Sequence, residues 1–405
     1  MTDRSVPRAA VGLDPECAAH AEPPTDLRLN PDRPVLFVTT EVPPDRVGAF
    51  QALAARVPIE LALFGGGLHA TDGVDDHGVP ARQVTQREVY GLAASGDYSA
   101  VVAGTVGRTA LPAAWLGSLR ARVPFILWTA LWAHPRSPAH LPGSLLLRIL
   151  YRRAAAVVTY GPHVSAFARA HGAAETIVAP QAVDTAFWSA NAPEVDRPSS
   201  GPIAPLEGGS APAVPPSTTA GAAKPALLYV GRDDPGKGVD WLLRAWDASG
   251  LGASGAAELR LVGPDPSRAA GRAGVTATGP LAPAEVRAAM VGAAAVVVPS
   301  ERTGTFREPW GLVINEAMHV GTLVIASTEV GAVAGGLARD GRTALVAKAG
   351  DVTQLAAALR TAADPDTPQL HEIRDRASRC AAAYTHEAWA GAFAQALEGP
   401  LACRS

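Results

Sequence analysis

Short apolar runs alternate along this chain with longer stretches in which apolar residues recur every three or four positions. The short runs are rich in Val, Leu and Ala and end at Gly, Pro or polar residues, which predicts buried β-strands. They lie at residues 34–40, 59–64, 98–103, 125–129, 155–159, 226–230, 259–263, 275–277, 293–300, 322–327 and 344–346. The longer stretches predict helices at 49–56, 141–153, 283–291, 310–320, 353–362 and 386–397. Strands that alternate with helices are typical of a parallel α/β sheet.

Two segments interrupt this alternation and divide the chain. Residues 1–33 are polar and broken by prolines, which predicts a disordered N-terminal tail. Residues 190–224 are rich in Pro, Gly, Ser and Ala, which predicts a flexible linker or insertion. We therefore expect one domain over residues 34–189 and a second over residues 225–385, followed by a final helix and tail at 386–405.

The composition suits a soluble globular protein, because 48% of the 405 residues are hydrophobic and 18% are charged. A formal net charge of −3 gives no overall attraction to nucleic acid, so we expect no nucleic-acid partner. Cys17, Cys380 and Cys403 have neither a disulfide pattern nor metal-ligand spacing. The chain shows no signal-peptide pattern and no apolar run of about 18 residues. These features together predict a cytoplasmic location.

Two carboxylates frame the segment between a predicted strand and the helix that follows it. Glu308 lies on the loop after the strand that stops at Pro299, and Glu316 lies about two turns inside the helix. Between them, backbone N–H groups near Gly311 and Leu312 are suited to bind phosphate oxygens. Carboxylates accept hydrogen bonds from neighbouring sugar hydroxyls. This spacing favours a ligand with a diphosphate between two hydroxyl-bearing parts, although an exposed loop Glu and an ordinary helix Glu fit it as well.

A second candidate site lies in the first strand-to-helix turn of the second domain. Gly231-Arg232 and Lys237-Gly238 place two cations at the carboxyl end of a predicted strand, where open α/β sheets bind ligands. Two cations there would neutralise a diphosphate, and a solvated charged turn is the alternative. The turn is not a P-loop, because Gly238 stands where a Ser or Thr hydroxyl is required, and it lacks a Gly-x-Gly-x-x-Gly fingerprint.

These motifs follow one another in a specific order. They run Tyr-Val-Gly-Arg…Lys-Gly, Leu-Val-Gly, Val-Val-Pro-Ser and Glu-Pro-Trp-Gly-Leu-Val-Ile-Asn-Glu-Ala. In this order they resemble the C-terminal domain of retaining family 4 glycosyltransferases of the GT-B fold. The segment from Gln181 to Phe187 resembles the family's Asn-Gly-Val-Asp segment at the domain junction. The resemblance covers residues 34–398 apart from the linker, and it implies two Rossmann-like domains that face each other across a cleft.

The resemblance implies a role for each matched side chain. Arg232 and Lys237 would bind the donor diphosphate and stabilise it as the leaving group. Glu316 would hold the ribose hydroxyls, and Glu308 would contact the transferred sugar near its reacting carbon. The implied reaction moves a sugar from a UDP- or GDP-type nucleotide sugar to an unknown acceptor, with retention of anomeric configuration.

The resemblance also implies donor contacts from the backbone and no cofactor. Gly311 and Leu312 would offer N–H groups to phosphate or sugar. No metal is expected, because the cations and the helix dipole would supply the electrostatic stabilisation. The Asp364-Pro365-Asp366 segment does not follow a strand, so we interpret it as a solvated turn.

Several positions depart from the family pattern. The family has paired glycines in the loop after its first strand, whereas only Gly48 remains in the predicted loop 41–48, as a candidate donor contact. Gly331-Ala332-Val333-Ala334-Gly335 stands where Gly-Gly-x-Pro-Glu is common. A first-domain His after a strand often faces the acceptor, and His134 is the candidate here. An aromatic-packed loop His is the alternative at that position.

The positive charge is concentrated in one stretch of the first domain. No acidic residue occurs between Asp97 and Glu175, whereas this stretch contains Arg108, Arg120, Arg122, Arg136, Arg148, Arg152, Arg153 and Arg169. Its helix at 141–153 combines Leu and Ile with three of these arginines. One interpretation is an anionic membrane surface, where lipid-linked acceptors reside, with the protein peripheral on the inner face. The other is a core helix with a solvated arginine face.

The sequence as a whole predicts a GT-B glycosyltransferase whose final helix crosses back to the first domain. Two alternatives stay open. The first is a non-catalytic nucleotide-sugar-binding protein of the same fold, suggested by the missing Gly and Glu residues. The second is an epimerase or a phosphorylase on this fold.

Overall fold

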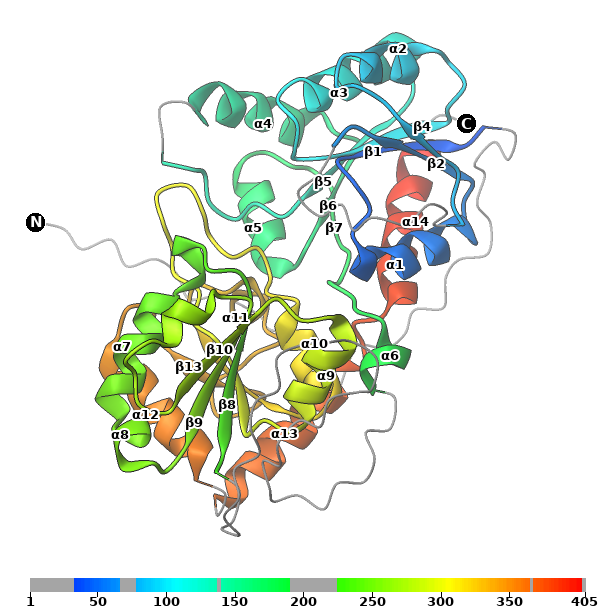
Figure 1. Ribbon diagram of the computed structural model, residues 1–405. Coiled ribbons are helices and arrows are strands. Elements are labelled where there is room, and N and C mark those ends of the chain that lie inside the picture. Colours follow the sequence, from blue (N-terminus) through cyan, green and yellow to red (C-terminus); the bar gives the residue numbers. More distant parts are fainter. Residues whose placement is uncertain (1–32, 66–77, 137–139, 190–223, 365–366, 403–405) are drawn as a thin grey trace, which may run out of the picture.

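The computed structural model describes residues 33–65, 78–136, 140–189, 224–364 and 367–402. Both sheets are parallel throughout and each carries helices on both faces, as the sequence predicts (Figure 1). The predicted N-terminal tail and linker lie, apart from Arg33 and Lys224, outside the described residues. Within the described ranges, no helix is long and apolar enough to cross a membrane.

The first domain is built on a seven-stranded sheet with the order β3-β2-β1-β4-β5-β6-β7 in the described part of the chain. Its strands are β1 (Val35–Thr39), β2 (Ile59–Leu63), β3 (Ala81–Gln83), β4 (Ala100–Gly104), β5 (Phe125–Thr129), β6 (Ala156–Thr159) and β7 (Thr176–Val178). Its helices are α1 (Pro44–Ala54), α2 (Glu88–Ala94), α3 (Ala110–Ala121), α4 (Leu141–Arg153), α5 (Pro162–Ala170) and α6 (Thr185–Ser189). Helices α2 to α5 pack on one face of the sheet, and α1 packs on the other.

The second domain has a six-stranded sheet with the order β10-β9-β8-β11-β12-β13 in its described residues. The strands are β8 (Ala226–Val230), β9 (Glu258–Val262), β10 (Val275–Gly279), β11 (Ala295–Val298), β12 (Leu323–Ser327) and β13 (Leu345–Ala347). The helices are α7 (Val239–Ser249), α8 (Leu251–Ser254), α9 (Pro283–Val291), α10 (Val313–His319), α11 (Gly331–Ala334), α12 (Val352–Ala363) and α13 (Pro368–Ala381). Two short 3₁₀ turns are η3 (Pro235–Lys237) and η4 (Pro266–Ala269).

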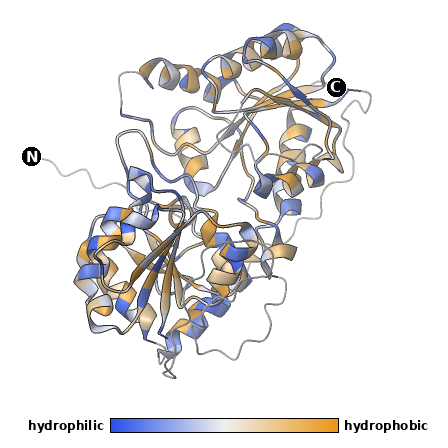
Figure 2. Ribbon diagram, viewed as in Figure 1, coloured by the Kyte–Doolittle hydropathy of each residue, from blue (hydrophilic) through white to orange (hydrophobic). Residues whose placement is uncertain are grey.

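The central strands are buried on both faces, which explains why they appear in the sequence as continuous apolar runs without alternation. Figure 2 shows hydrophobic residues along the strands and a mixture of both kinds on the surface helices. Each sheet therefore forms the middle layer of a three-layer domain.

The last helix, α14 (His386–Ala402), follows the second domain but packs in the first. Trp389 and Phe393 are fully buried, with ring centroids 4.3 Å apart. Both rings contact Phe37 of β1, and Trp389 lies edge-on to Phe50 of α1. Segments from the two ends of the chain thus share one core.

Two predicted boundaries near the candidate site were wrong. Helix α1 begins at Pro44, so Gly48 lies inside the helix and not in a loop. Proline fits the first turn of a helix, and Pro44 therefore starts α1 where the sequence suggested a break. Helix α10 begins at Val313 and not at Trp310, because Gly311 has a φ of +88°, which is outside the helical range.

Candidate donor site

The candidate residues of the second domain gather where its strand order reverses. Strands β8 and β11 are neighbours, and the chain continues outward from them in opposite directions. The turn after β8 carries Lys237, and the segment after β11 carries Glu308. Open parallel sheets bind ligands beyond the carboxyl ends of their strands at such a point. The fold therefore brings the two predicted motifs to one place.

Lys237 and Glu308 form an ion pair at this point. The distance from Lys237 Nζ to Glu308 Oε2 is 2.6 Å. Glu308 is only 6% exposed, and the Ser300 hydroxyl donates to the same oxygen at 3.1 Å. The Lys237 ammonium also lies 5.5 Å from the centre of the Phe306 ring. A carboxylate this deeply buried needs such partners, and they fix its position relative to the ammonium group.

The turn that carries Lys237 is pressed against the end of β11. Gly238 has a φ of +73°, and a Cβ atom added there would collide with the carbonyl oxygen of Pro299. A Cβ atom at Gly236 would collide with the Phe306 ring. This close approach explains why no Ser or Thr of a P-loop fits at position 238.

Arg232 shares the turn with Lys237 but has a different partner. Its exposed guanidinium lies 3.1 Å from Asp234, measured from Nη2 to Oδ2. The Tyr229 hydroxyl donates to the Arg232 carbonyl oxygen at 2.7 Å, which fixes the backbone of the turn. Both predicted cations are thus at the same sheet edge, and only Lys237 contacts Glu308.

Glu316 lies on α10 and faces the first domain. It is half-buried and accepts no hydrogen bond from the described residues. Burial, followed by the charge of Asp45 in the first turn of α1, raises the pKa of Glu316 to about 8. Gly311 and Leu312 precede α10, and their N–H groups donate to no other residue in the described ranges. The Glu316 carboxyl group and these two N–H groups are therefore available to bind a ligand at the domain junction.

The raised pKa of Glu316 predicts a pH-dependent stability. The folded-state pKa lies above the value of 4.5 for a free Glu, so the folded protein binds the proton more tightly. Its stabilising contribution is complete below about pH 4.5 and is lost as the pH rises toward 8. We expect E316Q to raise the unfolding midpoint relative to wild type at pH 8 and to have little effect at pH 5. Thermal unfolding of both proteins across this range checks the prediction, and an equal shift at both pH values would contradict it.

Trp132 and His163 of the first domain contact the loop that carries Glu308. Trp132 Nε1 donates to the Glu308 carbonyl oxygen at 3.1 Å, and His163 Nε2 lies 3.3 Å from the Pro309 carbonyl oxygen. The His163 ring stacks on Trp310, with centroids 6.1 Å apart and planes at 28°. Burial lowers the pKa of His163 to about 4, so the neutral ring donates its Nε2–H to Pro309 near pH 7. Its Nδ1 atom is buried without a partner among the described residues.

The sequence pattern did not identify His163. Its candidate for the histidine that faces the acceptor was His134. His134 packs between Phe167 and His171, with centroid distances of 5.0 and 4.8 Å, beside the C-terminal half of α5. Burial, with the nearby charges of His171 and Arg148, lowers its pKa. The structure therefore gives His134 the aromatic-packed position and does not bring it to Glu308. The signal for His163 is its place directly after β6, in the first turn of α5.

Gly48 also does not join the other candidate residues. A Cβ atom added at Gly48 would collide with the His386 ring, so this glycine allows α1 to pack closely against the start of α14. Arg46, two residues earlier, is buried and donates to the Gln181 side-chain oxygen. Its guanidinium also lies 5.6 Å from the centre of the Tyr160 ring.

A chain of hydrogen bonds leads from Arg46 to the donor-side helix. Asn315 Nδ2 donates to the Gln181 carbonyl oxygen at 2.7 Å, and Trp310 Nε1 donates to Asn315 Oδ1 at 2.8 Å. Arg46, Gln181 and Asn315 are all buried. This chain joins α1, the segment after β7 and α10, and so couples the first domain to the helix that carries Glu316.

Gly331 contacts the Glu308 loop closely because it has no side chain. Its N–H donates to the Glu308 carbonyl oxygen at 3.1 Å, and an added Cβ atom would collide with the Pro309 carbonyl oxygen. We expect G331A to lower the free energy of unfolding by about 1–3 kcal/mol, because the loop backbone must move. Chemical denaturation checks this, with G292A as the control, since a Cβ atom there meets nothing closer than 3.8 Å. Equal stability of the two variants would contradict the close approach.

The Asp364 segment follows helix α12. Asp364 ends α12, and Pro365 and Asp366 lie outside the described residues. Within those ranges, no group of three His, Cys, Asp or Glu side chains is placed to hold a metal ion.

Residues 224–364 match the family model described as Glycosyl transferases group 1, and this segment contains Lys237, Glu308 and Glu316. No curated protein matches the chain.

Solved structures match nearly the whole chain. HepE from Anabaena, in complex with UDP and glucose, is 19% identical over 89% of this chain and 98% of its own, with a TM-score of 0.65. Sucrose-phosphate synthase from Thermosynechococcus elongatus is 19% identical over 92% of this chain and 100% of its own, with a TM-score of 0.64. A UDP-forming α,α-trehalose-phosphate synthase from Burkholderia xenovorans is 13% identical over 90% of this chain and 98% of its own, with a TM-score of 0.62. These likenesses confirm the predicted two-domain fold.

Proposed function

We propose that this chain is a glycosyltransferase that moves a sugar from a nucleoside diphosphate sugar to an acceptor with retention of configuration, since residues 224–364 match the group 1 glycosyl transferases and the chain as a whole has the GT-B fold. The observation that carries the proposal is the Lys237–Glu308 ion pair at the strand-order reversal. The ion pair places a cation that can bind the diphosphate within hydrogen-bond distance of a carboxylate that can bind the sugar hydroxyls.

Each part of the donor has a matching group in the proposed complex. The Lys237 ammonium and the Arg232 guanidinium neutralise the charge that develops on the departing diphosphate. The N–H groups of Gly311 and Leu312 donate to phosphate or sugar oxygens. Glu316 accepts hydrogen bonds from the ribose hydroxyls, which supplies the partner that its half-buried carboxyl group lacks. These groups balance the diphosphate charge without a metal ion in this proposal.

The acceptor side of the proposed site belongs to the first domain. Trp132 and His163 reach the Glu308 loop from the carboxyl ends of β5 and β6. In the proposed complex, Glu308 contacts the transferred sugar. The sugar lies between Lys237 on one side and Trp132 and His163 on the other. A single-step transfer with retention requires the acceptor hydroxyl to approach the sugar on the face from which the diphosphate leaves, and we propose that it does so beside His163.

Thermal stabilisation by nucleotides is the direct test of the donor site. The panel contains UDP, GDP and their sugars, without added metal, and starts with UDP-glucose because HepE was solved with it. A ligand that binds only the folded state raises the unfolding midpoint by mass action. A shift with one base and its sugar supports the proposal, and no shift with any nucleotide contradicts it.

A product assay with the binding sugar nucleotide then separates the remaining alternatives. Release of nucleoside diphosphate with an acceptor, together with an NMR spectrum showing the donor's anomeric configuration in the product, supports retaining transfer. Binding without release supports a non-catalytic protein. Conversion of donor without acceptor marks an epimerase, and dependence on inorganic phosphate marks a phosphorylase.

A further inference from the structure

The exposed large apolar side chains of the described residues all belong to the first domain. They are Tyr90, Val106, Leu116, Leu119, Leu141, Leu145, Ile149 and Val178. Most of them lie on α2, α3 and α4, which cover the same face of the first sheet. Figure 1 shows this helical layer on the side of the first domain that is away from the second domain. We call it the α2–α4 face.

Helix α4 has two different apolar sides. One side is buried in the first-domain core through Leu147, Leu150 and Tyr151. The other exposes Leu141, Leu145 and Ile149, which are 67%, 63% and 41% exposed and follow one another at four-residue spacing. Residues four apart lie on the same face of a helix, so these three form one stripe. Helix α4 is therefore a core helix, as one of the two sequence interpretations predicts. Its exposed face, however, carries apolar side chains as well as arginines.

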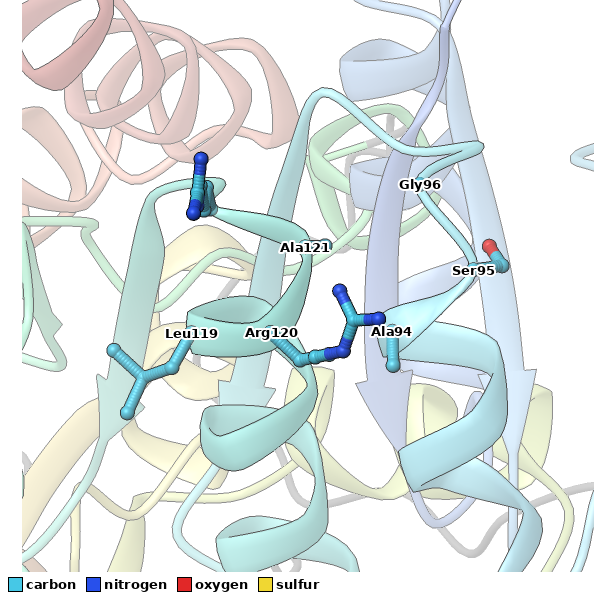
Figure 3. Close-up of a pocket in the computed structure, with 7 residues that line it drawn as sticks. Ala94, Ser95, Gly96, Leu119, Arg120 and Ala121 are labelled. Carbon is cyan, nitrogen blue, oxygen red and sulfur yellow. The ribbon is translucent and has the colours of Figure 1, made fainter.

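The same outer face is strongly basic. Arg148 and Arg152 are exposed beside the apolar stripe and line a cavity of about 270 Å³ with His171. At the end of α3, Arg120 and Arg122 line a cavity of about 520 Å³ with the end of α2 (Figure 3). No acidic residue occurs from position 98 to position 174, so α3 and α4 themselves contribute no negative charge, whereas α2 contributes the exposed Glu88.

We propose that the α2–α4 face docks on an anionic phospholipid bilayer. Arginines that flank exposed Leu and Ile side chains are the combination that binds such a surface, because the cations pair with lipid phosphates while the apolar groups enter the interfacial layer. A second copy of the chain fits less well, because a symmetric contact would place the arginines of one copy against those of the other. The surface lies outside the donor site, so docking is independent of the proposed reaction.

Vesicle co-sedimentation of the purified full chain tests this inference. The wild-type protein is mixed with vesicles of phosphatidylcholine alone or with phosphatidylglycerol at about one third. Two double variants remove the two features separately: L145Q/I149Q removes the apolar stripe, and R148Q/R152Q removes the charge. The matched controls are V178S, an exposed apolar residue on the edge strand β7, and R360Q/R379Q, two exposed arginines on α12 and α13.

We expect the wild type and both controls to sediment with the anionic vesicles and to be released by high salt. Each double variant should lower the partition coefficient roughly tenfold or more. Wild-type protein that stays in solution with anionic vesicles overturns the inference, as do double variants that bind like the controls. A concentration-dependent dimer that L145Q/I149Q abolishes, without vesicle binding, would assign the face to a second copy instead. Unchanged unfolding midpoints confirm that the variants fold, and since no nucleotide is present, the result does not depend on the proposed activity.

Discussion

Replacing Lys237 with alanine is expected to lower kcat by roughly 10²- to 10³-fold and to change the donor KM much less. The Lys237 ammonium lies 2.6 Å from the buried Glu308 carboxylate, at the point where the donor diphosphate is proposed to leave. Negative charge on the diphosphate increases as its bond to the sugar breaks. A fixed cation therefore stabilises the transition state more than it stabilises the bound donor.

The measurement is steady-state kinetics with the active donor, together with calorimetric binding of the nucleoside diphosphate. K348A is the control, because Lys348 is exposed and lies in the same domain. K237M serves as a second variant, since its unbranched side chain retains contact with the Phe306 ring and limits any loss of folding. An unchanged kcat in both Lys237 variants would remove Lys237 from the proposed mechanism.

Replacing Glu316 with alanine is expected to weaken donor binding about 10- to 100-fold with a smaller effect on kcat. A hydrogen bond to a charged group contributes about 1.5–3 kcal/mol, and a carboxylate can accept one from each ribose hydroxyl. Glu316 accepts none from the described residues, so the ligand would supply the missing donors. Isothermal titration of wild type and E316A with the nucleoside diphosphate measures the change.

The pKa of Glu316 gives this prediction a second observable. Because that pKa is about 8 in the free protein, most molecules carry a protonated carboxyl at pH 7. Hydrogen bonds from ribose favour the ionised form, so donor affinity should increase as the pH rises from 7 toward 8. E316Q cannot ionise and should lose this increase. Equal affinities of wild type, E316A and E316Q would place the ribose elsewhere.

The sequence predicted the fold and the second-domain motifs because both depend on local patterns. Strand β8 matches its predicted bounds, since Pro225 and Gly231 limit an uninterrupted apolar run at its two ends. Helix α4 also matches, because Leu141-Pro142 starts it and an extended Ala154 ends it. The contact between Lys237 and Glu308 was not predicted, because it depends on the strand order that makes β8 and β11 neighbours.

The first-domain part of the site depends on contacts between distant segments, which a local pattern does not contain. His163 contacts the Glu308 loop only because the two domains approach each other there, whereas His134 turns toward Phe167. The sequence predicts a loop at Gly48, because glycine and prolines usually interrupt helices. Its helix forms nevertheless, since the glycine lets α14 approach from the other end of the chain.

The position of α14 also sets an order for folding during synthesis. Strand β7 completes the first sheet at Val178, but Trp389 and Phe393 of α14 fill one side of that domain's core. A ribosome that has finished the first domain's strands must still produce the whole second domain before this side is covered. Domains generally fold as units in the order in which they emerge, whereas here the second domain is complete first. The sides of Phe37 and Phe50 that α14 covers therefore stay exposed in the nascent first domain until the last helix arrives, and we expect that domain to need protection from aggregation during this interval.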